Sequence, residues 1–240
     1  MGGLAKQFNR ALQKNHQTYA AWFPVSNTFK VGDYGYIESG VFRAIGNIKS
    51  DFDVEFTTKA GPESKIDISS EGTTSIKLLG GVEVPAFPGA GALEGKLNIG
   101  FNKSNSFVIK ANLTSEEMDS KQKVAWALAK HPHWKRKYKV IETTYTGKEG
   151  LVIASASGGF NIGITGSVDA LNALSNGNAN GDLSFENSNK ADFNSVGETG
   201  VIALRLFQIN RKGDVEFLKE LKEEDVEVNS LEGEELEDDL

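Results

Sequence analysis

The sequence predicts an α+β protein whose twisted, mainly antiparallel sheet is flanked by helices. Residues 36–110 alternate between apolar and polar positions in several successive segments, which is typical of strands. Turn residues, rather than helical segments, join most of these strands, and this favours antiparallel pairing. Helical periodicity is confined to a few segments. The 240 residues suffice for one sizeable domain or two small ones.

Composition narrows the classes further. There is no cysteine, so a disulfide framework, a thiol nucleophile and a thiolate metal site are all ruled out. The chain has no run of 18 apolar residues, so no membrane-spanning helix is predicted. The first residues lack the apolar stretch of a secretory signal, and we expect a cytoplasmic protein.

The first predicted element is a helix over residues 4–15. Leu4, Phe8 and Leu12 recur every four residues and give one apolar stripe. A basic stripe with the same spacing lies on another side: Lys6, Arg10 and Lys14. Such a helix packs on a core with its cations in water, or it lies on an anionic membrane surface.

Strands are predicted next. Residues 51–56, 65–69, 74–84 and 93–102 alternate in the manner of strands, and residues 85–95 form a loop rich in glycine, alanine and proline. The glycine spacing in that loop misses the dinucleotide-binding pattern, so phosphate binding is not expected there.

A strand over residues 106–114 precedes a predicted helix over 114–130, with Thr114 and Glu117 as a capping box. Its expected inner face is Met118, Val124, Ala125 and Leu128, and Pro132 ends it. Strands are then predicted at residues 138–146 and 200–209, and a last helix from residue 214.

Catalytic signatures are missing from the sequence. His131 and His133 have a spacing that a metal site uses, but no third ligand stands nearby. We therefore expect that the protein is not an enzyme and that it binds no metal ion and no cofactor. A basic cluster follows the histidines: Lys135, Arg136, Lys137 and Lys139. It is a solvated patch, a nucleic-acid contact or a contact with anionic membrane, and the weak overall positive charge of the body argues against nucleic acid.

Charge divides the chain unevenly. Residues 214–240 hold 13 acidic and 2 basic side chains, a net of −11, within a total of −7. The rest of the chain therefore carries a net of +4. A mildly basic body with an acidic tail favours an anionic partner for the body, or a tail that serves solubility.

Residues 150–168 form an uncharged stretch of alternating aliphatic and small polar residues. A strand that crosses lipid needs about 9–11 residues with one apolar face and one polar face. A soluble sheet covered on one side gives the same alternation. The glycine content favours the membrane interpretation, since glycine weakens ordinary strand interiors.

Two hairpins are candidates for insertion into a membrane. One pairs residues 74–84 with 93–102, and the other pairs residues 150–168 with 181–196. The predicted membrane-inserting side chains are Ile76, Leu78, Val82, Val84, Leu97, Ile99, Phe101, Phe160, Ile162, Ile164 and Val168.

The order of these features resembles the pore-forming domain of the gasdermin family. An amphipathic helix is followed by FPV (23–25), and later come YKVIETTYT (138–146), the alternating stretch and GVIALRLFQI (200–209). The resemblance covers residues 1–218, and residues 219–240 form an acidic tail. It is closest to the short bacterial or fungal members that lack a large inhibitory domain.

The resemblance implies a cell-death effector that waits in the cytoplasm and acts at the cell membrane. Acidic phospholipids would bind Lys6, Arg10 and Lys14, with the cluster at Lys135–Lys139 as a second contact. Copies would then form a ring and insert β-hairpins as a barrel. A protease, or a divergent partner variant, would be the trigger. The alternative is a soluble β-rich binding protein.

Overall fold

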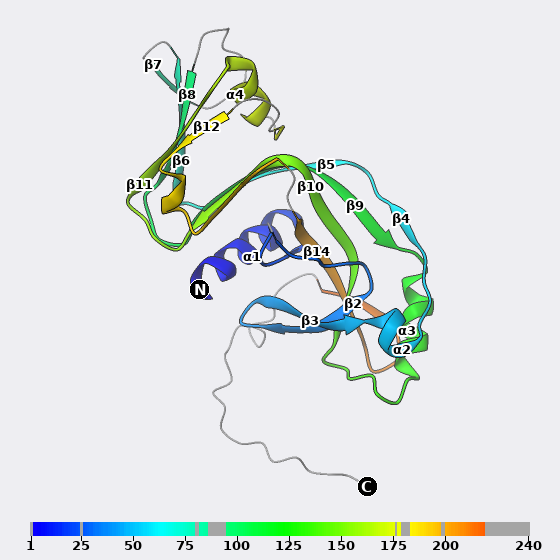
Figure 1. Ribbon diagram of the computed structural model, residues 1–240. Coiled ribbons are helices and arrows are strands. Elements are labelled where there is room, and N and C mark those ends of the chain that lie inside the picture. The colour runs from blue at the N-terminus through cyan, green and yellow to red at the C-terminus, as the bar shows by residue number, and fades with distance from the viewer. Residues whose placement is uncertain are drawn as a thin grey trace, which may run out of the picture.

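A computed structural model describes residues 2–24, 26–79, 82–85, 95–175, 177–178, 183–197 and 200–218. It confirms the α+β fold with mainly antiparallel sheets. A large curved sheet forms the body, and a smaller sheet projects from one end of it (Figure 1). Every strand pairing among the described residues is antiparallel.

The large sheet contains ten of the described strands. Its continuous path runs β1-β14-β10-β2-β3, and β9 lies on β10 with β4 and β5 on its other side. The strands are β1 (Tyr19–Ala20), β2 (Asp33–Glu38), β3 (Val41–Asn47), β4 (Thr58–Ala60), β5 (Ser64–Ser69), β9 (Ser106–Met118), β10 (Lys139–Ser155), β13 (Phe193–Val196), β14 (Val201–Ile209) and β15 (Val215–Phe217).

The small sheet has the order β12-β11-β8-β6-β7. Its strands are β6 (Thr73–Leu79), β7 (Val82–Pro85), β8 (Gly95–Phe101), β11 (Phe160–Gly166) and β12 (Leu183–Glu186). Each of these strands except β7 is separated by only a few residues from a strand of the large sheet. The small sheet is therefore an extension of the hairpins of the large one.

The first helix, α1 (Gly2–His16), lies in the hollow of the large sheet (Figure 1). Leu4, Phe8 and Leu12 are buried against the sheet, as the apolar stripe predicts. Helix α4 (Val168–Ser175) covers the small sheet. The other helices are α2 (Ile48–Phe52), α3 (Lys121–Ala129) and a 3-10 turn at Ser188–Lys190.

One predicted strand is wrong, one predicted helix begins later than predicted although Val124, Ala125 and Leu128 form its buried face, and the predicted last helix is wrong over its described residues. Residues 51 and 52 end helix α2, and residues 53–56 follow it outside any helix or strand. The helix forms here because the Asn47 side chain caps it by accepting from the Lys49 N–H. Residues 114–118 continue strand β9, so the Thr114–Glu117 capping box does not exist and α3 begins only at Lys121. Residues 215–217 form strand β15, not a helix.

Other predictions are confirmed or fall outside the description. The strands predicted at 138–146 and 200–209 are β10 and β14, although β10 continues to Ser155. Most of the loop at 85–95 and the tail at 219–240 lie outside the described residues. Among the described residues, no helix combines the length and apolar character needed to cross a bilayer.

Candidate functional site

Four chain segments cross between the two sheets at one place, which we call the corner. It consists of residues 70–72, 102–105, 156–159 and 187–192, each of which links a strand of the large sheet to a strand of the small sheet. The two segments in the middle join β9 to β8 and β10 to β11. In the large sheet β9 pairs with β10, and in the small sheet β8 pairs with β11. We call these two pairings together the inner ladder.

The inner ladder keeps one register on both sides of the corner. In the large sheet Ser106 pairs with Ser155, and in the small sheet Phe101 pairs with Phe160, so the residue numbers of each pair add to 261. Each arm crosses the corner with four residues, and the Asn105 N–H donates to the Ala156 carbonyl within it. A straightened inner ladder would therefore run without a slip from Asn112 and Glu149 to Gly95 and Gly166.

Residues with positive φ produce the bend. Asn105 has φ 59°, Gly159 has φ 83° and Asn187 has φ 59°, and they lie on three of the four crossing segments. Extended strands do not contain this conformation, which residues other than glycine adopt at a cost. The corner is therefore a local departure from a structure that could otherwise continue as strand.

Apolar residues occupy matching positions on both sides of the corner. Every even-numbered residue from 150 to 166 is Gly, Ala, Val, Phe or Ile. Their partners in the inner ladder are odd-numbered residues, which are apolar or glycine except at Lys103 and Asn105 in the corner. Because directly opposed residues share a face of an antiparallel pair, these residues would form one apolar face in a straightened ladder.

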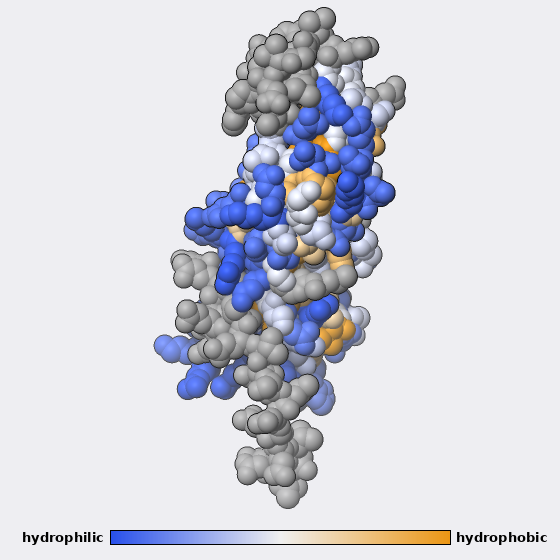
Figure 2. Space-filling view, turned by 90° about the vertical axis from the view of Figure 1, so that its left-hand side faces the viewer, coloured by the Kyte–Doolittle hydropathy of each residue, from blue (hydrophilic) through white to orange (hydrophobic). Residues whose placement is uncertain are grey.

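In the folded protein this face is covered in two halves. The half in the large sheet, which includes Phe107, Ile109 and Val152, packs under α1. The half in the small sheet packs with Leu171 and Leu174 of α4, and also with Val108, Leu151 and Ile153 from the other face of the large sheet. Consistent with this covering, the side of the molecule shown in Figure 2 is largely hydrophilic, with only small hydrophobic areas between polar ones.

The structure brings six of the predicted membrane-inserting residues together. Five of them are buried in the small sheet and the sixth, Phe160, is half-buried and stacks on Phe101 at a ring distance of 5.1 Å. The six are Leu97, Ile99, Phe101, Phe160, Ile162 and Ile164. The predicted second arm, residues 181–196, is confirmed over its described part, because β12 pairs with β11 and β13 with β10.

The remaining predicted residues are not on the same face as these six. The register places Ile76 opposite Asn98 and Leu78 opposite Lys96. Strand β7 folds back on β6, so that Val84 lies opposite Lys77 and Val82 opposite Leu79. Val168 begins helix α4 and does not extend the strand. The prediction that Ile76, Leu78, Val82 and Val84 face one way is therefore wrong for this folded state.

Basic residues of α1 lie beside the corner. Arg10 and Lys14 are exposed, whereas Lys6 is half-buried. Together with Lys103 of the corner, Arg10 and Lys14 line an open depression of about 450 Å³. Its other walls carry the hydroxyl groups of several serines and one carboxylate, that of Glu71, so cations outnumber anions there by three to one. No ion pair joins these three cations to another residue of the described ranges. Anions can therefore approach α1 and the corner at the same place.

The second predicted basic group is only partly assembled. Lys135, Arg136 and Lys137 are exposed on the segment between α3 and β10. Lys139 is different, because it lies in β10 and its ammonium group donates to the Gln208 amide oxygen at 2.8 Å. Its ammonium group is therefore bound at the sheet, and Lys139 does not belong to the exposed basic group of the other three.

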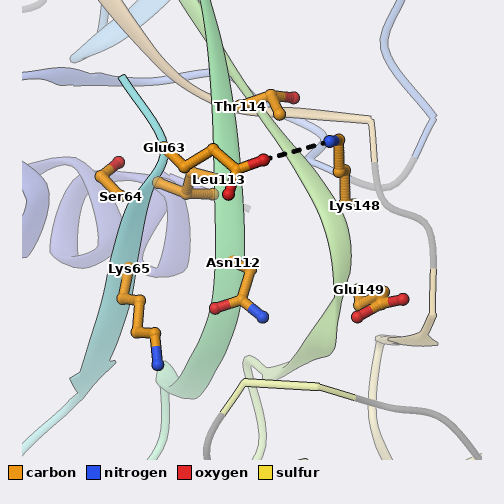
Figure 3. Close-up of a pocket in the computed structure, with 8 residues that line it drawn as sticks. All are labelled: Glu63, Ser64, Lys65, Asn112, Leu113, Thr114, Lys148 and Glu149. Carbon is orange, nitrogen blue, oxygen red and sulfur yellow. Dashed lines mark hydrogen bonds and ion pairs between the residues drawn. The ribbon is translucent and has the colours of Figure 1, made fainter.

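A second depression, of about 370 Å³, marks the foot of the inner ladder (Figure 3). It lies where a bulge between Gly147 and Glu149 shifts the register of β10 against β9. Glu63 and Lys148 form an ion pair of 3.3 Å across it, and Lys65 also lines it. Charges of both signs are mixed here, so the depression does not favour a ligand of one charge.

A buried ion cluster fixes α3 to the large sheet. The Glu142 carboxylate is 1% exposed and lies 2.9 Å from the Lys121 ammonium group and 3.3 Å from Arg205 Nε. Lys121 also bonds Glu117, and this bond holds the pKa of Glu117 below its ordinary value. Burial lowers the pKa of Lys121, but its bonds to Glu117 and Glu142 outweigh that effect and hold this pKa above its usual value.

Sequence reasoning missed helix α4 and the corner. Ser167 and Ala170 carried a usable signal for the helix, since the Ala170 N–H bonds the Ser167 hydroxyl as in an N-cap, and Leu171 and Leu174 follow at helical spacing. The corner had a weaker signal, in the glycines and asparagines at positions 105, 159 and 187. The equality of the two crossing segments is visible only from the register.

The fold and this site define a class of protein: an α+β protein whose apolar hairpin face is divided by a corner and covered by two helices. Comparisons with known proteins do not assign the chain to a family. No protein-family model matches the chain, and no curated protein is similar to it. Among the described residues, no group of three or more histidines and carboxylates is placed to hold a metal ion.

Proposed function

We propose that the protein is a latent pore-former that binds anionic membranes, oligomerises and inserts hairpins of the two sheets as part of a β-barrel. The observation that carries the proposal is the unbroken register of the inner ladder. A barrel strand must be continuous, paired on both sides and apolar on one face. Straightening the corner would supply such strands without breaking the inner pairing.

The length of the straightened ladder fits this function. Residues 95–112 would extend for about 60 Å at about 3.3 Å per residue. A tilted transmembrane strand needs only about 9–11 residues, so the ladder is long enough to cross a bilayer and remain joined to the body. Lys103 would lie at the end of the apolar run of β8, where a lysine reaches the interface with its charged end.

Recruitment would begin at α1. Arg10 and Lys14 are exposed beside the corner, and cations close to an anionic bilayer contribute about 1 kcal/mol each. Because α1 also covers the apolar residues of the large sheet, its movement onto lipid would uncover one half of the hairpin face. Binding and uncovering would then be coupled through one helix.

A β-rich binding protein that does not act on lipid is the second candidate. The observation that favours it is the depth of burial of the hairpin face, where Ile162 and Ile164 are fully buried. Such residues are ordinary in a stable soluble core. This candidate predicts a protein whose size does not change when vesicles are added.

Dye release from vesicles tests the proposal. The full chain and a chain ending at Leu218 are added to carboxyfluorescein-loaded vesicles, with or without phosphatidylserine. We expect release from the anionic vesicles by at least one of the two chains. The absence of release from both, with no change in oligomeric size, would refute pore formation.

Two neighbouring substitutions make the test specific. Phe160→Lys places a charge on the proposed lipid face, whereas Asn161→Lys places the same charge on the other face. A charge facing lipid costs about 2–4 kcal/mol in each strand at mid-bilayer and less towards the interface. Phe160 would lie two residues from Gly158, the position opposite Lys103, so Phe160→Lys should reduce release and Asn161→Lys should retain it. Thermal melting of both variants checks that they fold. Equal release by the two would contradict the assignment of faces.

A further inference from the structure

The register of β6 in the small sheet does not continue the register of β5 in the large sheet. In the large sheet, β5 pairs with β9 so that Ser69 lies opposite Val108 and the residue numbers add to 177. In the small sheet, β6 pairs with β8 so that Thr73 lies opposite Phe101 and the numbers add to 174. Six residues lie between Phe101 and Val108, whereas only three lie between their partners Thr73 and Ser69, so the inner side of the corner has three more residues.

The odd size of this difference matters for the faces of the sheet. A shift by an odd number of residues exchanges the two faces of a strand. On the other side of the inner ladder, the pairs of β10 with β13 add to 347 and those of β11 with β12 add to 349, an even difference that preserves the faces. Only the pairing of β6 changes face at the corner.

The folded register of β6 is unsuited to lipid. It sets Lys77 opposite Leu97 and Ser75 opposite Ile99, on the apolar face of β8. If β6 instead continued the register of β5, Ile76 would lie opposite Phe101 and Leu78 opposite Ile99, since both pairs add to 177. Lys77 would then move to the face of Asn98 and Gly100, away from lipid.

Hydroxyl groups hold the folded register at the corner. The Ser70 and Thr73 hydroxyls are 2.9 Å apart, and the Thr73 hydroxyl donates to the Phe107 carbonyl at 3.0 Å. The Phe107 N–H donates to the Ser70 hydroxyl, and the Ser106 hydroxyl donates to the Lys103 carbonyl at 2.7 Å. These bonds span the segment that contains the three extra residues.

We infer that β6 slips by three residues against β8 when the protein enters a membrane, and that the resulting face fits the hydrocarbon layer. The folded register keeps Ile76 and Leu78 out of phase with the rest of the apolar face, so the complete lipid-facing surface exists only after the slip. This inference rests on the proposed pore-forming function and specifies how the hairpin of β6 and β8 is regulated.

Engineered cysteine pairs report the register directly, because the natural chain has no cysteine. Thr74→Cys with Gly100→Cys joins residues that are opposed in the folded register. Ser75→Cys with Asn102→Cys joins residues that are opposed only after a slip of three. A displacement of three residues is about 10 Å, and a disulfide cannot form between Cα atoms more than about 7 Å apart.

We expect the 74–100 pair to cross-link in solution and the 75–102 pair to cross-link only on phosphatidylserine vesicles. Oxidised 74–100 protein should lose at least about nine-tenths of its dye release, which dithiothreitol should restore. Oxidised 75–102 protein on vesicles should remain active. The two unpaired single variants, Thr74→Cys and Ser75→Cys, control for the substitutions.

The outcomes separate the slip from pore formation. Release by the wild-type chain together with full release by the oxidised 74–100 variant would overturn the slip and leave pore formation standing. Failure of the 75–102 pair to cross-link on vesicles that the same variant permeabilises would also overturn the slip. Absence of release by the wild-type chain would overturn both.

Discussion

At the scale of single residues, Gly159 is the position where backbone conformation most directly controls the corner. It has φ 83°, and a Cβ atom added there would meet no atom within 4 Å. Substitution therefore tests conformational strain without a steric clash. A β-branched residue with positive φ is strained by about 1–2 kcal/mol, and this strain disappears in an extended strand.

Gly159→Val should accordingly destabilise the folded protein and favour straightening of the corner. We expect a lower melting temperature and dye release at a lower fraction of phosphatidylserine than the wild type needs. Gly40→Val is the matched control, because Gly40 has φ 76°, with its nearest atom 4.0 Å away, but lies in the turn between β2 and β3. If the two variants lose stability equally and leak equally, the corner has no special role.

At the scale of elements, α3 depends on a charge that acid removes. The bond from Lys121 lowers the pKa of Glu117 from its ordinary 4.5. A lowered folded-state pKa stabilises the protein above pH 4.5, and this contribution is lost as the pH falls through the folded-state pKa. Between α3 and the sheet, acid therefore weakens one ion pair of the cluster around Glu142.

Glu117→Gln should lower the free energy of unfolding by about 1 kcal/mol at pH 7, and the difference from wild type should shrink as the pH falls below 4.5. Urea unfolding at a series of pH values measures it. Glu63→Gln is the control, since the Glu63 side chain is 79% exposed in its pair with Lys148 and should change little at any pH. A difference for Glu117→Gln that stays constant down to pH 3 would contradict the assigned pair.

Elements also differ in how well the sequence reveals them. Four-residue spacing located α1, and alternation located β8 and β11, because these segments bury one apolar face. Strand β14 was located by its nearly continuous aliphatic run, and it is buried on both faces. Residues 51–56 alternate equally well, yet only Phe52 and Val54 are buried, on opposite sides of the positive-φ residue Asp53. Alternation alone does not distinguish a strand from a helix end followed by an extended segment.

The sequence pattern did not predict how β6 pairs with β7 and β8. The pattern placed Ile76, Leu78, Val82 and Val84 on one face, which would hold in a single continuous strand. The chain instead turns back between β6 and β7 and crosses the corner with unequal numbers of residues, so these positions are divided. The first feature had a local signal, because two glycines at positions 80 and 81 separate the alternating runs, as in a two-residue hairpin. The second depends on hydrogen bonds between distant segments, and a local pattern contains no information about it.

At the scale of the whole molecule, two helices from opposite parts of the chain divide one apolar face between them. Helix α1 precedes every strand, and α4 lies between β11 and β12. In the proposed function both must leave before the face becomes continuous. Removal of one cover alone would expose only half of the face, so the covered state resists accidental opening.

The same arrangement leads to a prediction about membrane recruitment. Arg10→Glu combined with Lys14→Glu should weaken binding to phosphatidylserine vesicles by about 30-fold or more at low salt, since each lost cation accounts for about 1 kcal/mol. Raising the ionic strength should narrow the difference, because exposed charges are screened. Vesicle co-sedimentation at several salt concentrations measures the effect.

The control is Arg211→Glu combined with Lys212→Glu, which changes the net charge equally at two exposed residues between β14 and β15, away from α1. A similar loss of binding in both double variants would show that vesicles respond to net charge rather than to α1, and the helix would then lose its assigned part in recruitment.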